Sequence, residues 1–205
     1  MQRKPSSLRQ QIESFGLNPP SWNDHELGCP DQWPASLKTL AYTMLSSSLP
    51  SYFCWGEDRF LIFNRAYQPL LADRGKTAFG KKFIDVWPEL WREFVPFFER
   101  VAQGETVVFR DHYLRLERKG FEEDTYFDFS LSPACDSEGN TMGLRCICSE
   151  TTERIASEKR AALALEERTL ESDRLQLHQE WLTATLRGIG DAVIATDASL
   201  VPKVA

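Results

Sequence analysis

The feature that most constrains the fold of this chain is a long carboxyl-terminal stretch without helix breakers. No glycine or proline occurs from Leu144 to Arg187, and from Thr152 onward Ala, Leu, Glu, Arg and Lys dominate. These residues have high intrinsic helix propensity, whereas Gly and Pro disfavour the helix interior most strongly. The composition therefore predicts one long helix over residues 152–187, which follows a fold of a different kind.

This predicted helix carries half of a coiled-coil seam. One apolar position recurs every seven residues, at Ala156, Leu163, Leu170, Leu177 and Ala184. The complementary heptad positions are charged: Lys159, Glu166, Asp173 and Glu180. A stable coiled coil needs apolar residues at both positions. The spacing thus predicts a solvated linker helix that supports a homodimer through Leu163, Leu170 and Leu177 and is weak by itself.

The composition of the whole chain excludes several classes of protein. Its 205 residues include 13 Phe, 6 Trp and 5 Tyr, an aromatic content that requires a buried core and excludes a disordered chain. The net charge is −6 and no Lys/Arg tract occurs, which disfavours nucleic-acid and membrane partners. With neither a membrane-spanning run nor a secretory signal, we expect a cytoplasmic protein with small-molecule or protein partners. The five irregularly spaced cysteines then predict free thiols.

The elements before the long helix predict an α+β fold. Residues 1–48 form a leader, broken by prolines, with helices expected at 7–15 and 36–48. Strands are expected at 51–56, 59–64, 106–117, 125–132 and 140–150, with helical segments between 65 and 102 that Pro96 should kink or split. Two strands, a run of short helices and three more strands indicate a five-stranded antiparallel sheet with helices on one face.

The strand at 125–132 shows the clearest alternation. Phe127, Phe129 and Leu131 fall on one face, and Tyr126, Asp128 and Ser130 fall on the other. We therefore expect Phe129 to point into the core.

Several motifs in this order resemble a PAS sensor domain over residues 33–154. They are WPASLKT before the domain, CWGEDRFLIFNRAYQPLL, GKKFIDVWPELW, DTYFDFSLSPACDSEGN and, at the exit, SETTERI. The resemblance is to the PAS domains of soluble bacterial sensor histidine kinases and related signalling proteins, and it implies a PAS domain at 49–151. A second segment, LRGIGDAVIATD, resembles the opening strand of another PAS domain, so residues 188–205 are expected to be its truncated start.

The resemblance implies a sensory module that passes a signal through the linker helix to a downstream output domain. The alternative is a purely structural dimerisation module that binds no ligand. The resemblance also places the signal exit at Glu150, Thr151 and Thr152, an acidic-x-Thr motif at the end of the last strand. There the carboxylate can pair with a basic residue, and a threonine hydroxyl can cap the outgoing helix.

Aromatic side chains supply the candidate pocket. Core packing explains most of them, but Trp and Tyr bring a polar tip to an apolar wall and so suit a cavity. The candidates are Trp55, Phe63, Tyr67, Trp87, Trp91 and Phe98. No haem or flavin signature occurs, and the cofactor, if any, stays open. Cys146 and Cys148 are expected to be small core residues rather than metal ligands. No catalytic motif is found, which predicts a chain that is not itself an enzyme.

Overall fold

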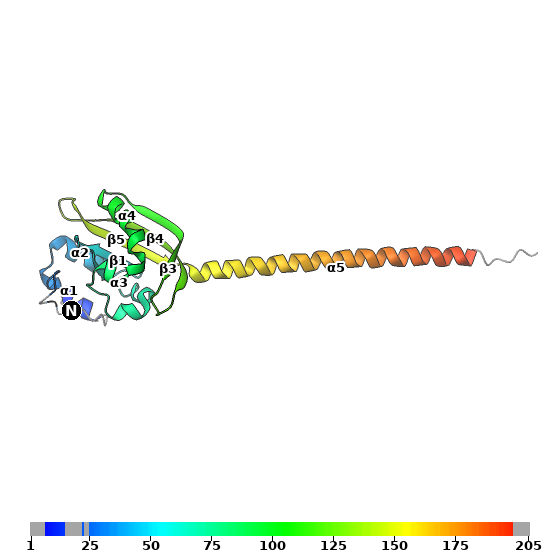
Figure 1. The fold of residues 1–205 in the computed structure, drawn as a ribbon, viewed down its shortest axis with the longest axis horizontal. Coiled ribbons are helices and arrows are strands. Elements are labelled where there is room, and N and C mark those ends of the chain that lie inside the picture. The colour runs from blue at the N-terminus through cyan, green and yellow to red at the C-terminus, as the bar shows by residue number, and fades with distance from the viewer. Residues whose placement is uncertain (1–6, 15–21, 23–24, 199–205) are drawn as a thin grey trace, which may run out of the picture. The chain divides into compact units, whose positions relative to one another are not determined.

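Five strands form one antiparallel sheet. The computed structural model describes residues 7–14, 22 and 25–198, with side chains described as far as Arg187 (Figure 1). The strands are β1 (Ser51–Trp55), β2 (Phe60–Phe63), β3 (Val107–Leu116), β4 (Glu123–Cys135) and β5 (Thr141–Glu150). Their spatial order is β2-β1-β5-β4-β3, so the first and last strands in the sequence are neighbours. The predicted α+β fold with a five-stranded antiparallel sheet is confirmed.

The predicted alternation of β4 is also confirmed. Phe127, Phe129 and Leu131 are buried, whereas the residues between them are only partly buried. On β5, Leu144, Cys146 and Cys148 are buried in the same alternating way. These two central strands therefore present one apolar face to the helices.

Short helices cover that face between β2 and β3. They are η2 (Gln68–Lys76), α3 (Phe83–Val86), η3 (Pro88–Leu90) and α4 (Trp91–Ala102). Pro96 lies inside α4 and does not split it, so of the two predicted outcomes, a kink or a split, the split is wrong; the change from 3-10 to α-helix comes at Trp91. Proline removes one backbone hydrogen bond, but α4 buries Phe94, Phe98 and Val101 along one side, and this packing holds the helix together.

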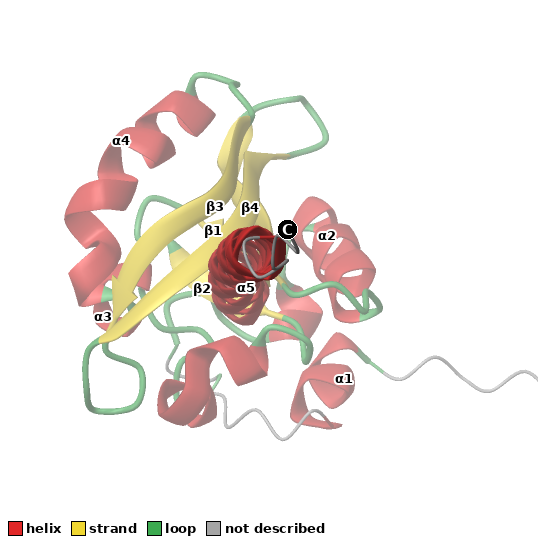
Figure 2. Cartoon of the chain, turned by 90° about the vertical axis from the view of Figure 1, so that its right-hand side faces the viewer, coloured by secondary structure: helices red, strands yellow, loops and turns green. Residues whose placement is uncertain are grey.

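The leader covers the opposite face of the sheet. It contains α1 (Leu8–Ser14), η1 (Pro30–Gln32) and α2 (Ala35–Leu45), so both predicted helices are present. Figure 2 shows α2 and α4 on opposite sides of the sheet. Every residue of β1 and β2 is buried, because both faces of these two strands are covered. Residues Met1–Glu153 accordingly form a single compact unit that includes the leader.

Asn64 joins the leader to the sheet. Its fully buried side-chain amide donates to the carbonyl oxygens of Leu49 at 2.7 Å and Ser47 at 3.1 Å. Its Oδ1 accepts from the backbone N–H groups of Ser51 at 3.2 Å and Tyr67 at 3.0 Å. One side chain thereby ties the segment after α2 and the start of β1 to the turn that carries Tyr67.

The long helix α5 (Thr152–Ala198) begins at the end of the Met1–Glu153 unit, and from Arg154 onward it belongs to the second unit. Every side chain from 157 to 187 is exposed. Beyond 187 the helix continues, whereas an opening strand was predicted in this segment, so that prediction is wrong for residues 188–198; residues 199–205 lie outside the described part of the chain. A lone strand leaves its backbone groups unpaired, while a helix satisfies them internally. Among the described residues, no helix combines the length and apolarity needed to cross a membrane.

Candidate ligand cavity and signal exit

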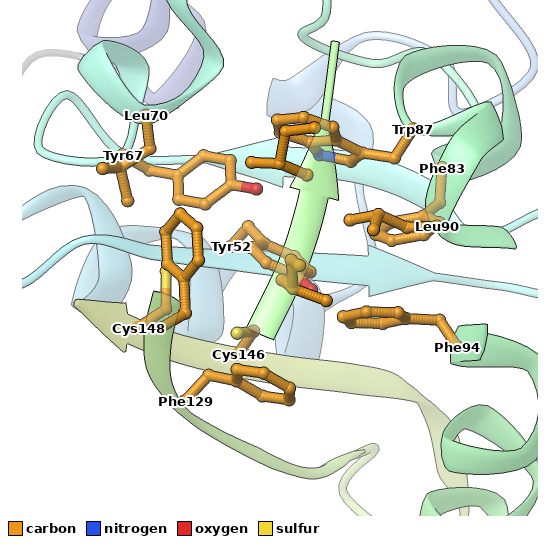
Figure 3. A pocket seen from close by; sticks show the side chains of 13 residues that line it. Tyr52, Tyr67, Leu70, Phe83, Trp87, Leu90, Phe94, Phe129, Cys146 and Cys148 are labelled. Atoms are coloured by element: carbon orange, nitrogen blue, oxygen red, sulfur yellow. The ribbon is translucent and has the colours of Figure 1, made fainter. Parts of the chain in front are cut away.

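A small internal cavity of about 40 Å³ lies between the sheet and the helices that cover it. It has room for a few water molecules. Figure 3 shows side chains from β1, β4 and β5 facing those from η2, α3 and α4 across it. The lining residues are Tyr52, Tyr67, Leu70, Phe83, Trp87, Leu90, Phe94, Leu114, Leu116, Phe127, Phe129, Cys146 and Cys148.

Three titratable groups in this wall are held in their neutral forms. Burial, followed by the neighbouring thiols, raises the pKa of the Tyr52 and Tyr67 hydroxyls well above their usual value. A hydrogen bond with the Cys146 thiol, followed by burial, raises the pKa of Cys148. Because burial penalises the charged form, both phenols and this thiol stay protonated at neutral pH. No lining residue is an acid, a lysine or an arginine.

Trp87 brings an unsatisfied polar group to the same wall. Its ring is buried, and its Nε1 has no hydrogen-bond partner among the described residues. On the ring face, the Arg74 guanidinium lies 5.0 Å from the centroid. The Arg74 charge is already neutralised, since it pairs with Glu89 at 2.8 Å and also donates to the Val86 and Glu117 carbonyl oxygens.

The structure brings only part of the predicted pocket together. Tyr67 and Trp87 line the cavity. Trp91 and Phe98 lie under the Arg59 guanidinium, which is 5.1 and 4.7 Å from their ring centroids. Phe98 also lines a separate surface hollow of about 320 Å³.

The two other predicted residues lie on β1 and β2. Phe63 packs edge-on against Phe79 at 5.3 Å. Trp55 falls on the face of β1 opposite to Tyr52, because the two are an odd number of residues apart. The sequence reasoning missed Tyr52, Phe94 and the two β5 cysteines. Their period-two positions on β1 and β5, and the apolar face of α4, were the signals available.

The predicted signal exit is built around Arg118, in the turn between β3 and β4. Its nearly buried guanidinium holds the Glu150 carboxylate with two hydrogen bonds of 2.9 Å. It also donates to Glu123 at 3.2 Å and to the Leu70 carbonyl oxygen at 3.0 Å. Burial works to lower the pKa of Arg118, but the interactions with Glu150 and Glu123 raise it overall. The guanidinium therefore stays charged and fixes the end of β5.

The two threonines complete this cluster. Thr152 donates from its hydroxyl to Glu150 at 3.0 Å and accepts from the Tyr126 backbone N–H at 3.0 Å. Thr151 donates to the Asp111 carboxylate at 2.8 Å, and its own N–H donates to the Tyr126 carbonyl oxygen. The Thr152 hydroxyl thus ties the first residue of α5 to β4 and to Glu150.

An antiparallel sheet with a cavity under short helices, and a last strand that runs through a polar cluster into a long helix, defines a class of sensory and signalling domains. The family described as the PAS fold matches residues 46–156, more than half of the chain. The chain belongs to this PAS-fold family.

Solved structures that are similar to this chain include two PAS domains. The PAS domain of BvgS from Bordetella pertussis is 25% identical with a TM-score of 0.46, and the match covers 64% of this chain and 96% of that one. A PAS domain from Colwellia psychrerythraea is 15% identical with a TM-score of 0.43, covering 57% and 98%. Phage VqmA, solved in complex with DPO, is 16% identical with a TM-score of 0.43, covering 64% of this chain and 60% of that one.

Proposed function

We propose that this chain is the sensory PAS module of a signal-transduction protein of the sensor histidine kinase type. The state of the cavity is passed through α5 to a downstream output domain. One observation carries the proposal: a single guanidinium joins the cavity wall to the exit. Leu70 lines the cavity, and its carbonyl oxygen accepts from the same Arg118 Nη1 that donates to Glu150.

The hydrogen bonds between Leu70, Arg118 and Glu150 are suited to shifting the signalling equilibrium by a small free energy rather than to holding the domain in one state. A ligand that shifts η2 changes the position of the Leu70 carbonyl oxygen and so redistributes the hydrogen bonds of Arg118. Glu150 and Thr152 respond because they share that cluster. A hydrogen bond to a charged group contributes about 1.5–3 kcal/mol. Changes of that size shift a two-state signalling equilibrium by an order of magnitude or more.

Removing the exit contacts should change output without unfolding the domain. Residues 1–187 are fused in register to the helix of a reporter histidine kinase, and autophosphorylation is measured for Glu150→Gln and Thr152→Val. We expect basal activity to change by about ten-fold or more in each variant, because each weakens a hydrogen bond to a charged group that contributes about 1.5–3 kcal/mol.

Thr39→Val is the matched control, because the Thr39 hydroxyl bonds only within α2, to the Ala35 carbonyl oxygen. Thermal melting verifies that each variant is folded. If both exit variants fold and leave the reporter activity at the wild-type level, the exit does not transmit a signal.

The exposed leucines of α5 favour a second function, self-association. Leu163, Leu170 and Leu177 are 61%, 64% and 66% exposed at heptad spacing. Helices in proteins gain most of their stability from packing an apolar face against a partner, so these exposed leucines favour a partner helix. If the protein dimerises but the exit variants leave the reporter activity unchanged, the module is structural rather than sensory.

Leu163→Glu combined with Leu170→Glu should convert a dimer into a monomer in light scattering at about 100 µM, where a dimer of micromolar affinity is largely assembled. Leu165→Glu combined with Leu175→Glu is the control, since these residues are similarly exposed at 66% and 58% but lie off the seam. A monomeric wild type, or the same dissociation in both double variants, would rule out the seam.

A further inference from the structure

The unpartnered indole N–H of Trp87 is the starting point. An indole nitrogen can only donate a hydrogen bond, and a buried donor without an acceptor is destabilising. Native structures contain few such groups, and each one calls for an explanation. Trp87 is buried and lines the cavity, so a molecule bound in this space can supply the missing acceptor.

Two further donors face the same space. Figure 3 shows the Tyr67 hydroxyl and the Trp87 nitrogen directed toward each other across the cavity, with the Tyr52 hydroxyl on the sheet side. The Trp87 side chain lowers the pKa of the Tyr67 hydroxyl, although burial raises it overall, so the indole N–H lies close to this hydroxyl without a hydrogen bond of normal geometry. Because burial keeps both phenols protonated, each can donate to an occupant.

The rest of the wall excludes ionic occupants. The remaining lining residues are leucines, phenylalanines and two cysteines. Arg74 lies on the face of the Trp87 ring, but its guanidinium is already paired with Glu89. A carboxylate or an ammonium group would therefore be buried without a counter-charge, which is strongly unfavourable.

We infer that the cavity selects a small uncharged molecule whose hydrogen-bond acceptor, a carbonyl-type oxygen, sits between Trp87 Nε1 and the Tyr67 hydroxyl. Its apolar body contacts the phenylalanines and the β5 cysteines. The volume of about 40 Å³ limits this body to a few heavy atoms in the present shape of the cavity. The inference specifies the ligand class of the proposed sensory function and rests on it.

Three probes of the same shape test this class. Acetone is neutral and has an acceptor, acetate carries a charge, and 2-methylpropene has no acceptor. Each is titrated into the full chain, while the Trp87 indole N–H resonance reports the site and ligand-observed NMR gives the affinity. We expect a saturable shift of the Trp87 resonance with acetone and none with acetate or 2-methylpropene.

Variants then assign the contacts. Tyr67→Phe and Trp87→Phe each remove one donor and keep an aromatic ring, so acetone affinity should fall by about five-fold in each. Trp91→Phe is the control outside the cavity and should bind as the wild type does. Acetone binding is measured without the reporter kinase. If acetone binds as expected but the exit variants leave reporter activity unchanged, only the proposed signalling function is rejected, and the inferred ligand class stands.

Three results would overturn the inference. They are an equal response to acetate, an equal response to 2-methylpropene, or no saturable shift with acetone at all. The last result would mean that the cavity holds water only. Tyr67→Phe keeps the test valid should Trp87→Phe fail to fold.

Discussion

Replacing Phe129 with alanine should destabilise the protein by about 3–5 kcal/mol, the range for removing a buried aromatic ring. Phe129 is buried on β4, stacks on Phe94 with a centroid distance of 5.7 Å and contacts Phe109 at 4.8 Å. Its loss would open a void between the sheet and α4. Urea denaturation followed by tryptophan fluorescence measures the change.

Ser130→Ala is the control, because Ser130 is the next residue of the same strand and falls on the opposite, partly buried face. It should cost less than about 1 kcal/mol. Equal denaturation midpoints for the two variants would show that the side-chain phase of β4 is wrong.

Gly143→Ala should cost about 3 kcal/mol by forcing two strands apart. Gly143 pairs with Trp55 across the β1–β5 ladder. A Cβ at this position would lie far inside van der Waals contact with the Cys54 carbonyl oxygen. This neighbour is backbone, which cannot move aside as a flexible side chain can, and such overpacking costs about 1–3 kcal/mol or more.

Gly139→Ala separates this clash from the general cost of replacing glycine. Gly139 has a φ of 91°, and a Cβ there would meet nothing within 4 Å. That variant should lose only about 1 kcal/mol, from the unfavourable positive φ. If thermal unfolding shows the same loss for both variants, the close approach of β1 and β5 does not limit stability.

The sequence predicts the sheet well because its signals are local. The alternation of Phe127, Phe129 and Leu131 sets the phase of β4 without reference to any other strand. The absence of Gly and Pro predicts α5 in the same local way. Past residue 187 the composition resembles a strand, yet the chain is helical, because a strand needs a neighbour that no local pattern can supply.

The site is less predictable because its contacts are distant in the sequence. Arg118 and Glu150 lie 32 residues apart, and Arg118 and Leu70 lie 48 apart. A basic partner for the exit carboxylate was expected, but nothing in the sequence distinguishes Arg118 from the other arginines. In the same way, Trp91 and Phe98 are residue types that often line cavities, but their rings contact Arg59 instead.

The hydrogen bonds of Asn64 have a consequence for the size of the minimal folding unit. The match to the family begins at residue 46, after α2 has ended, and a fragment cut there would lose the helices packed behind β1 and β2. Asn64 bonds to the Ser47 and Leu49 carbonyls on one side and to the Tyr67 amide on the other. The leader thereby supports a cavity that it does not line, and a substitution that displaces the leader would also displace Tyr67 in the cavity wall.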